Sequence, residues 1–293
     1  MNPADPWLPV VQAFVQAYEQ GERLTAAADG PAVPGPALPA ASPPTGPTLL
    51  LCSPHPDDES LTGTLPLRLR REHGARVVNL ASTLGSNPAR QAARREELLA
   101  ACRVLGFTCQ LLAAPAAFVL KAGPGGQVWQ AVARTLADLI NELAPDLVFF
   151  PHADDHHPAH CATNQLVAAA LALASRRQAQ PLRAVETEYW RPMARPNLLV
   201  GIAPGDVARL IAAVACHRGE IERNPYHLTL PARLLDSVRR GAEVVAANQA
   251  GRPPFLFGEL YRLSLWHQGV NQELSVNPGW LPPDQGLYGL VSD

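Results

Sequence analysis

Two clusters of histidine and acidic residues stand out in this sequence of 293 residues. Residues 54–59 read PHPDDE, and residues 151–160 read PHADDHHPAH, which holds four of the nine histidines of the chain. Imidazole and carboxylate groups are the ligands that a borderline divalent metal prefers, and two histidines plus one aspartate leave positions open for water and substrate. The two clusters therefore predict a divalent metal site that can do chemistry.

The spacing inside each cluster suits this interpretation. Asp57 and Asp58 are adjacent, so in an irregular loop one carboxylate can bind the metal while the other faces the bound water. His157 and His160 are three residues apart, and their imidazoles share nearly one face of a helix if Pro158 begins it. Each cluster thus offers groups for binding a metal and for moving a proton.

Each cluster also has a plainer interpretation. An acidic turn after a strand is commonly a helix N-cap, which Asp57, Asp58 or Glu59 can supply, and histidines in loops are usually solvated. We favour the metal site because both clusters directly follow predicted strands. Glu59 is then expected to begin a helix or to support the ligands rather than to be a ligand itself.

The elements around the clusters predict a parallel sheet. Apolar runs predict buried strands at 48–52, 76–82 and 146–151, with a short strand at 109–112. Helical patterns cover 61–73, 91–105, 128–143 and 158–175. This alternation is typical of an α/β fold with helices on both faces of the sheet, and ligands bind beyond the carboxyl ends of its strands. We expect a Rossmann-like three-layer sandwich with a mostly parallel sheet and both clusters at the ligand edge.

The rest of the chain is less regular. After about residue 181 the pattern predicts strands at 184–190, 198–202 and 259–267 and helices at 206–222 and 232–248, which we interpret as a C-terminal α/β elaboration. Near the N-terminus, Asp5 and Pro6 can cap and begin a helix over 5–20, and a Pro/Ala/Gly-rich linker or arm follows at 30–47. The expected division is an arm over 1–47 and one domain over 48–293, with its core at 48–180 and the elaboration at 181–293.

Composition excludes several classes of protein. The 24 Lys+Arg and 26 Asp+Glu residues give a net charge of −2, which argues against nucleic acid as a partner. No apolar run has the length of a membrane span, and the N-terminus lacks the basic segment of a secretory signal. Five scattered cysteines without a CxxC pair suggest reduced thiols in a cytoplasmic protein. The sequence leaves a homo-oligomer open.

Three segments together resemble a known family. PHPDDE, then RREELLAACRVLG at 94–106, then HHPAH after a strand are similar to the PIG-L/LmbE-like metal-dependent deacetylases, which act on N-acetylglucosaminyl compounds. The resemblance covers about residues 48–175. By this resemblance the metal ligands are His55, Asp58 and His160, and the general base is Asp57. The resemblance also implies that His157 stabilises the oxyanion or protonates the leaving amine, and that Arg94 contacts the substrate.

Two departures from the family pattern bear on the substrate. The family usually reads HPDH, and here Ala159 stands where an aspartate would tune the first histidine. Asp155 is our expected substitute for that aspartate, and we place it with Arg94 among the substrate-binding residues. The loop at 83–87 replaces an Asp-Gly that commonly helps to shape the sugar pocket, which leaves the substrate open.

The resemblance implies an amidohydrolase that removes an N-acetyl group from an N-acetylglucosaminyl-type sugar or conjugate. In the expected mechanism the metal polarises the carbonyl, Asp57 takes a proton from the attacking water, and a cationic His157 stabilises the oxyanion. Zinc is the expected metal, and ferrous iron stays open because two histidines and one carboxylate suit it as well. Two alternatives remain: the same site acting on a non-sugar amide, and a carbohydrate-binding protein without turnover.

Overall fold

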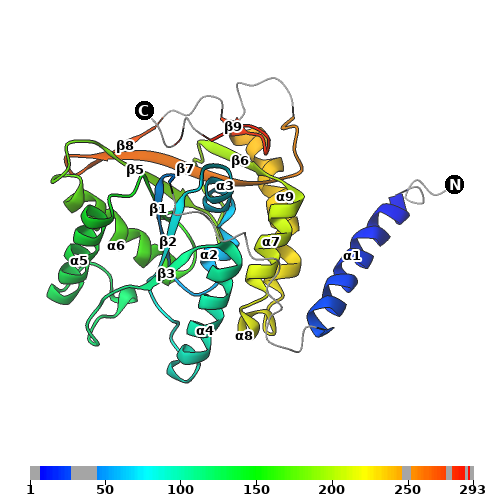
Figure 1. Cartoon of the computed structure of the whole chain (residues 1–293), viewed down its shortest axis with the longest axis horizontal. Helices are drawn as coiled ribbons and strands as arrows, with labels where there is room; N and C mark the ends of the chain where they lie inside the picture. The colour runs from blue at the N-terminus through cyan, green and yellow to red at the C-terminus, as the bar shows by residue number, and fades with distance from the viewer. Residues whose placement is uncertain (1–6, 28–44, 246–251, 275–278, 288–289, 291–293) are drawn as a thin grey trace.

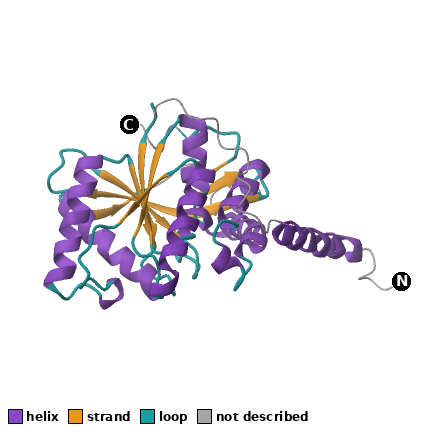
Figure 2. Ribbon diagram, turned by 60° about the horizontal axis from the view of Figure 1, so that its bottom comes forward, coloured by secondary structure: helices purple, strands orange, loops and turns teal. Residues whose placement is uncertain are grey.

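A twisted β-sheet forms the centre of the protein, and helices cover both of its faces (Figures 1 and 2). The computed structural model describes residues 7–27, 45–245, 252–274, 279–287 and 290. The strands in these residues are β1 (Thr48–Ser53), β2 (Arg76–Ala81), β3 (Thr108–Leu111), β4 (Leu147–Pro151), β5 (Leu182–Thr187), β6 (Leu198–Ile202), β7 (Phe257–His267), β8 (Val270–Glu273) and β9 (Trp280–Leu281).

The sheet has a parallel half and a mainly antiparallel half. Its strand order is β3-β2-β1-β4-β5-β7-β6-β9, and β8 pairs with β7. The first five strands in that order are parallel neighbours, whereas β7 runs antiparallel to β5 and β6. The predicted α/β fold with a parallel core is confirmed, and the second half of the sheet is the C-terminal elaboration.

The helices other than α1 cover the two faces of the sheet. The helical elements are α1 (Leu8–Ala27), α2 (Asp58–Leu61), α3 (Thr64–His73), α4 (Pro88–Leu105), the 3-10 turn η2 (Leu120–Ala122), α5 (Gln127–Leu143), α6 (Pro158–Ala174), α7 (Pro204–Val214), α8 (Arg218–Ile221) and α9 (Tyr226–Val244). Apolar residues of α5 and α6 pack on one face of the sheet, and those of α3, α4, α7 and α9 belong to the core on the other.

Strand β1 shows why both faces need cover. Side chains alternate along a strand, so Leu49 and Leu51 lie in the core under α3 and α4, while Leu50 and Cys52 lie in the core under α5 and α6. All four are buried. An uninterrupted apolar run is therefore what a strand covered on both faces requires.

Several predicted boundaries were wrong. The helix predicted at 61–73 is two helices, because Gly63 approaches α2 so closely that a Cβ there would lie 2.5 Å from the carbonyl oxygen of Glu59. The helix predicted at 206–222 is also two, α7 and α8, and α9 begins six residues before its predicted start and contains Pro231. Strands β8 and β9 were not predicted. All four residues of β8 are exposed and β9 has only two residues, so neither strand shows a run of apolar residues in the sequence.

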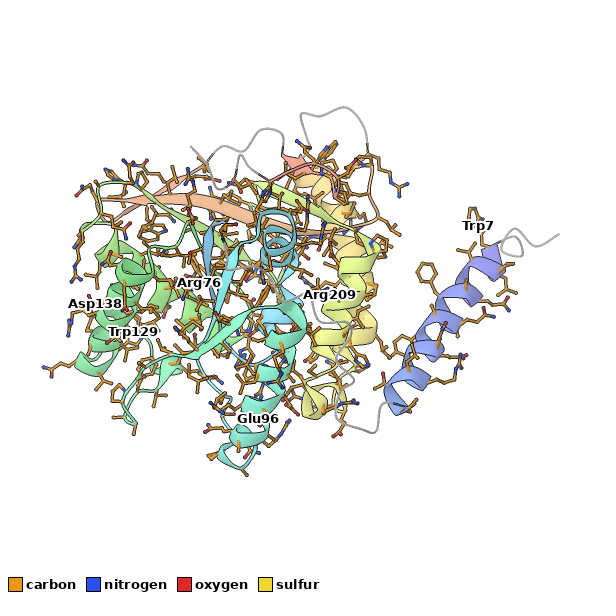
Figure 3. All side chains as sticks on the ribbon, in the orientation of Figure 1. Trp7, Arg76, Glu96, Trp129, Asp138 and Arg209 are labelled. Carbon is orange, nitrogen blue, oxygen red and sulfur yellow. The ribbon has the colours of Figure 1, made fainter. Side chains whose placement is uncertain are left out.

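Helix α1 lies to one side of the body (Figure 1). It has no buried residue, and Figure 3 shows Trp7 at the end of the helix that is remote from the sheet. Its other end meets α9, where the Thr25 hydroxyl lies 2.7 Å from Nε2 of His227. Asp5, Pro6 and most of the predicted 30–47 linker fall outside the described residues, so the division into arm and domain stays a prediction.

Two further features of the described residues concern the cysteines and the membrane. All five cysteines are free thiols, in agreement with the absence of a CxxC pair. None of the helices in the described part of the chain is both long enough and apolar enough to cross a membrane.

Candidate metal and catalytic site

The two clusters of the sequence lie side by side because their strands are neighbours. β1 and β4 are parallel and paired, with Leu51 opposite Phe149, so the residues that follow each strand emerge at the same edge of the sheet. After β4, helix α6 begins at Pro158 as expected, and His157 is its N-cap, with Nδ1 accepting a 3.3 Å hydrogen bond from the Ala159 N–H.

Three imidazoles and one carboxylate converge at this edge. Nitrogen atoms of His55, His157 and His160 all lie within 4.8 Å of one another. The Asp58 carboxylate lies between two of these rings, with Oδ2 3.5 Å from Nδ1 of His55 and Oδ1 3.4 Å from Nε2 of His160. The Asp58 carboxylate is also fixed by the backbone, because the N–H of His55 donates to its Oδ2 at 2.9 Å.

This group of side chains fits a divalent metal. His160 is buried, and its ring lies between two carboxylates, with Nε2 3.4 Å from Oδ1 of Asp58 and Nδ1 3.2 Å from Oδ2 of Asp155. Burial opposes the charged form of each group, but mutual attraction outweighs it: the pKa of Asp58 falls below its usual range and the pKa of His160 rises to about 10. A cation bound among these atoms would satisfy both groups.

Asp57 differs from Asp58 in backbone and charge. Its φ of 122° is a conformation that residues other than glycine rarely adopt, and such strain collects at functional sites. The Asp57 N–H donates to Oε2 of Glu59 at 2.9 Å. Burial and the nearby Asp58 carboxylate raise the pKa of Asp57 well above its ordinary value of 3.8. A desolvated carboxyl with a raised pKa is suited to accept and return a proton.

The surroundings of His157 favour the neutral ring over the expected cationic form. Burial and the neighbouring rings of His55 and His160 lower its pKa to about 4. Because Nδ1 accepts a hydrogen bond from the Ala159 N–H, the proton of the neutral ring is on Nε2. The ring also stacks on Trp190, with centroids 5.8 Å apart. His157 is therefore a neutral hydrogen-bond donor held by an aromatic neighbour.

We expected Asp155 to replace the missing aspartate that would tune His157, but the Asp155 carboxylate pairs with the ring of His160 instead. Its Oδ2 lies 3.2 Å from Nδ1 of His160, and its Oδ1 accepts only the backbone N–H of His157. The rings of His157 and His160 converge, with centroids 5.3 Å apart, and the Asp155 carboxylate lies on the Nδ1 side of the His160 ring. Its side chain is buried there and is absent from the lining of the large cavity.

The side chain of Arg94 contacts a backbone carbonyl of the first cluster. Its Nη2 donates to the carbonyl oxygen of Pro56 at 3.0 Å and lies 3.7 Å from Oε1 of Glu220. The guanidinium fits against Gly85, where a Cβ would lie 2.2 Å from Nη1. Arg94 also lines the cavity, so this geometry is compatible with contact to a substrate and with support of the metal loop.

Sequence reasoning missed the residue that pairs with Glu59. His217 Nε2 lies 2.8 Å from Oε1 of Glu59, and both side chains are fully buried. Burial opposes a charge on His217, but the carboxylate of Glu59 outweighs it and raises the pKa of His217. The two residues are 158 positions apart, and no local motif links them. The C-terminal elaboration thus supports the loop that carries Asp57.

The clusters open into a cavity of about 990 Å³. Asp57, Asp58 and the three clustered histidines line one part of it. Other walls come from loop 82–87, from residues 111–121 and from the aromatic residues Tyr189, Trp190 and Tyr226. Polar and charged residues of the lining complete them: Arg90, Gln91, Arg94, Glu220 and Arg223. This volume is at the upper end of the range for sites that bind small molecules.

Comparisons with known proteins agree with this geometry. Residues 50–171 match the family model described as PIG-L, GlcNAc-PI de-N-acetylase. No match was found among curated proteins. Among solved structures, the chain is similar to the conserved protein TT1542 from Thermus thermophilus, with 25% identity and a TM-score of 0.55 over 73% of this chain and 92% of that one.

Two further structures share the fold. N,N'-diacetylchitobiose deacetylase from Pyrococcus horikoshii is 18% identical, with a TM-score of 0.56 over 76% of this chain and 86% of that one. GalB, a 4-carboxy-2-hydroxymuconate hydratase from Pseudomonas putida, is 17% identical, with a TM-score of 0.57 over 74% and 95%. Because one fold carries both reactions, the fold by itself does not assign an activity.

The family match is more specific than the fold, since residues 50–171 contain both His/Asp clusters and Arg94. By this match residues 50–171 are similar to the PIG-L family, and the match supports a hydrolytic deacetylase that acts on amide bonds.

Proposed function

We propose that this protein is a metal-dependent amidohydrolase that removes the N-acetyl group of an N-acetylglucosaminyl-type sugar or conjugate. One observation carries the proposal. The strained, buried Asp57 carboxyl lies beside a His/Asp cluster in an open cavity at the carboxyl ends of parallel strands. A strained acid with a raised pKa next to a metal-binding group is an arrangement for hydrolysis.

His55, Asp58 and His160 would hold the metal, which we take to be zinc. When bound, the ion would polarise the amide carbonyl and lower the pKa of water. The donor set of imidazole nitrogens and a carboxylate suits zinc and ferrous iron, so the two ions must be distinguished by measurement. Asp155, behind His160, would orient that ring as metal-ligating histidines require.

Asp57 and His157 would do the proton chemistry. Asp57 would accept a proton from the attacking water and return it to the departing nitrogen, so that the products are the free amine and acetic acid, which then ionises to acetate. The neutral His157 would donate its Nε2–H to the oxyanion that develops on the carbonyl oxygen. Arg94, at the cavity wall, would contact the sugar.

The test combines metal content with turnover. Wild type and variants are assayed by elemental analysis and, on a panel of N-acetylated sugars and non-sugar amides, for released acetate and new primary amine. We expect about one metal per chain in the wild type and its loss in His160→Ala. Asp57→Asn should keep the metal and lose about 10²–10⁴-fold in turnover. His156→Ala is the control, because His156 is exposed and outside the cluster.

Two outcomes would overturn the proposal. A wild-type protein that holds no metal after anaerobic reconstitution with zinc and with ferrous iron would remove the mechanism. Near wild-type turnover in Asp57→Asn would remove Asp57 as the base. Product from non-sugar amides alone would keep the site and replace the substrate.

A further inference from the structure

One wall of the cavity is an uncharged, exposed loop. Residues 111–120 read LLAAPAAFVL, ten apolar residues in succession, and connect β3 to η2. Leu111 and Val119 are 43% and 61% exposed, and residues 113–117 are exposed as well. Eight of the ten residues line the cavity. Leu120 is buried in the core, and Leu112 and Phe118 are partly buried against it, so Leu111, residues 113–117 and Val119 form the exposed part of this wall. Exposed apolar surface that lines a cavity marks a binding surface.

A second apolar wall of the same cavity is aromatic. Trp190 is 44% exposed, and its ring lies 5.4 Å from that of Tyr189 and 6.4 Å from that of Tyr226, measured between centroids. Among the described residues after α1, seven large apolar side chains are exposed, and three of these, Leu111, Val119 and Trp190, line this one cavity. The exposed apolar surface of the body is therefore concentrated where the substrate must enter.

The same cavity holds Asp57, so whatever covers the apolar walls lies next to the reacting amide. A cavity of about 990 Å³ is large enough for a drug-sized molecule, and the polar cluster occupies only one part of its lining. The apolar walls and the catalytic groups thus line one cavity, which polar residues of loop 82–87, α4 and α8 also line. This shared cavity favours a part of the substrate itself as the occupant, over a membrane or a second protein.

We propose that residues 111–120, with Trp190 and Tyr226, form a subsite for an apolar alkyl or aryl group carried by the substrate. The proposal rests on the proposed amidohydrolase function and narrows its substrate class to amphiphilic N-acyl amines, such as a sugar with an apolar aglycone. Each methylene that leaves water for an apolar surface adds up to about a fourfold gain in affinity. A chain of several methylenes therefore gives a large, measurable effect.

The test measures kcat/KM against chain length. One series lengthens the aglycone of an alkyl N-acetyl-β-glucosaminide from methyl to hexyl, and a second lengthens the N-acyl group of the methyl glycoside. We expect a rise of about two- to fourfold per methylene, or on the order of 10²-fold over five methylenes. The series that shows the rise identifies which side of the amide carries the apolar group.

The variants locate the subsite. Val119→Asp should flatten the dependence on chain length, because it places a charge on the apolar wall. Val270→Asp is the matched control, since Val270 is 57% exposed on β8 and does not line the cavity. It should keep the wild-type slope. A slope near zero in both series for the wild type, or equal slopes in Val119→Asp and wild type, would overturn the proposal.

Binding without turnover separates this inference from the proposed function. Hexyl and methyl β-glucoside carry no amide, and calorimetry should find the hexyl compound bound on the order of 10²-fold more tightly. That result in a protein inactive on every amide would leave the subsite standing and refute only the hydrolase. If Val119→Asp instead abolished sedimentation with phosphatidylglycerol vesicles or dissociated a dimer, with no preference for hexyl, the wall would belong to a membrane or a second copy, and the proposal would fail.

Discussion

Replacing His217 by leucine tests how strongly the buried pair next to Asp57 stabilises the fold. The Glu59 and His217 side chains are both 0% exposed, and their charged atoms lie 2.8 Å apart. Removing one partner of a buried ion pair leaves the other charge uncompensated, which costs about 3–5 kcal/mol. In domains of 150–250 residues, 1 kcal/mol corresponds to about 2–4 °C in Tm, so we expect a loss on the order of 10 °C.

The assay is thermal unfolding by calorimetry, with variants that separate charge from packing. His217→Gln can still donate a hydrogen bond to Glu59 and should lose less than His217→Leu. The double variant Glu59→Leu/His217→Leu removes both charges, so its loss should be smaller than the sum of the two single losses. Arg239→Leu is the control, because Arg239 pairs with Asp236 at the exposed surface, and it should leave Tm nearly unchanged.

The pH dependence of the same variants gives an independent check. The pKa of His217 is raised in the folded protein above its ordinary value of 6.5, because the Glu59 carboxylate outweighs burial. A raised pKa means that the folded state binds the proton more tightly. The stabilisation is therefore complete below pH 6.5 and is lost as pH rises through the folded-state pKa. The difference in Tm between wild type and His217→Leu should narrow on the alkaline side.

A small effect would refute this reasoning. If His217→Leu lost less than about 1 kcal/mol, the other donors to Glu59, the N–H of Asp57 and the hydroxyl of Ser60, would already satisfy its carboxylate. Equal losses in His217→Gln and His217→Leu would mean that packing, not the hydrogen-bonded charge pair, stabilises this region.

Two further predictions concern the metal ligands and the loop beside them. Asp155→Asn should weaken metal affinity by about 10–100-fold, because the carboxylate on Nδ1 of His160 is lost. Competition with a chelator measures the affinity, and the exposed Asp154→Asn is the control. Equal metal affinity in the two variants would contradict this role of Asp155. Gly85→Ala should destabilise the protein by about 1–2 kcal/mol, since φ is +89° at this position. Gly205→Ala in α7 is the control, because the added Cβ would have no atom within 4 Å and should not destabilise the protein. Urea unfolding compares the two variants, and equal stability would contradict the strain expected at position 85.

The sequence by itself determined the parallel core of the sheet and the edge at which the two clusters lie. The runs at 48–52 and 146–151 are apolar at every position that a strand covered on both faces must bury, and Pro158 suits the first position of a helix. These are local properties of consecutive residues. Because parallel strands end at the same edge of a sheet, PHPDDE and HHPAH are expected at one edge; the pairing of β1 with β4 in the structure then places them side by side.

Only the tertiary structure decided which partner each side chain has. Asp155 lies on Nδ1 of His160 rather than on the ring of His157, whose own Nδ1 accepts the Ala159 N–H. His217 meets Glu59 across 158 residues because α7 and α8 pack on the face of the sheet that the PHPDDE loop also meets. The charge of His157 depends on rings from both clusters.

The apolar wall of the cavity shows the same division. The sequence contains the apolar run LLAAPAAFVL, but a run of ten apolar residues is equally typical of a buried core, so the sequence does not show that it is exposed. Exposure depends on what covers a segment, and the structure leaves Leu111 and Val119 uncovered at the cavity. Periodicity and motifs therefore determine elements and the types of group at a site, whereas partners, protonation and exposure depend on contacts between distant segments, which no local pattern encodes.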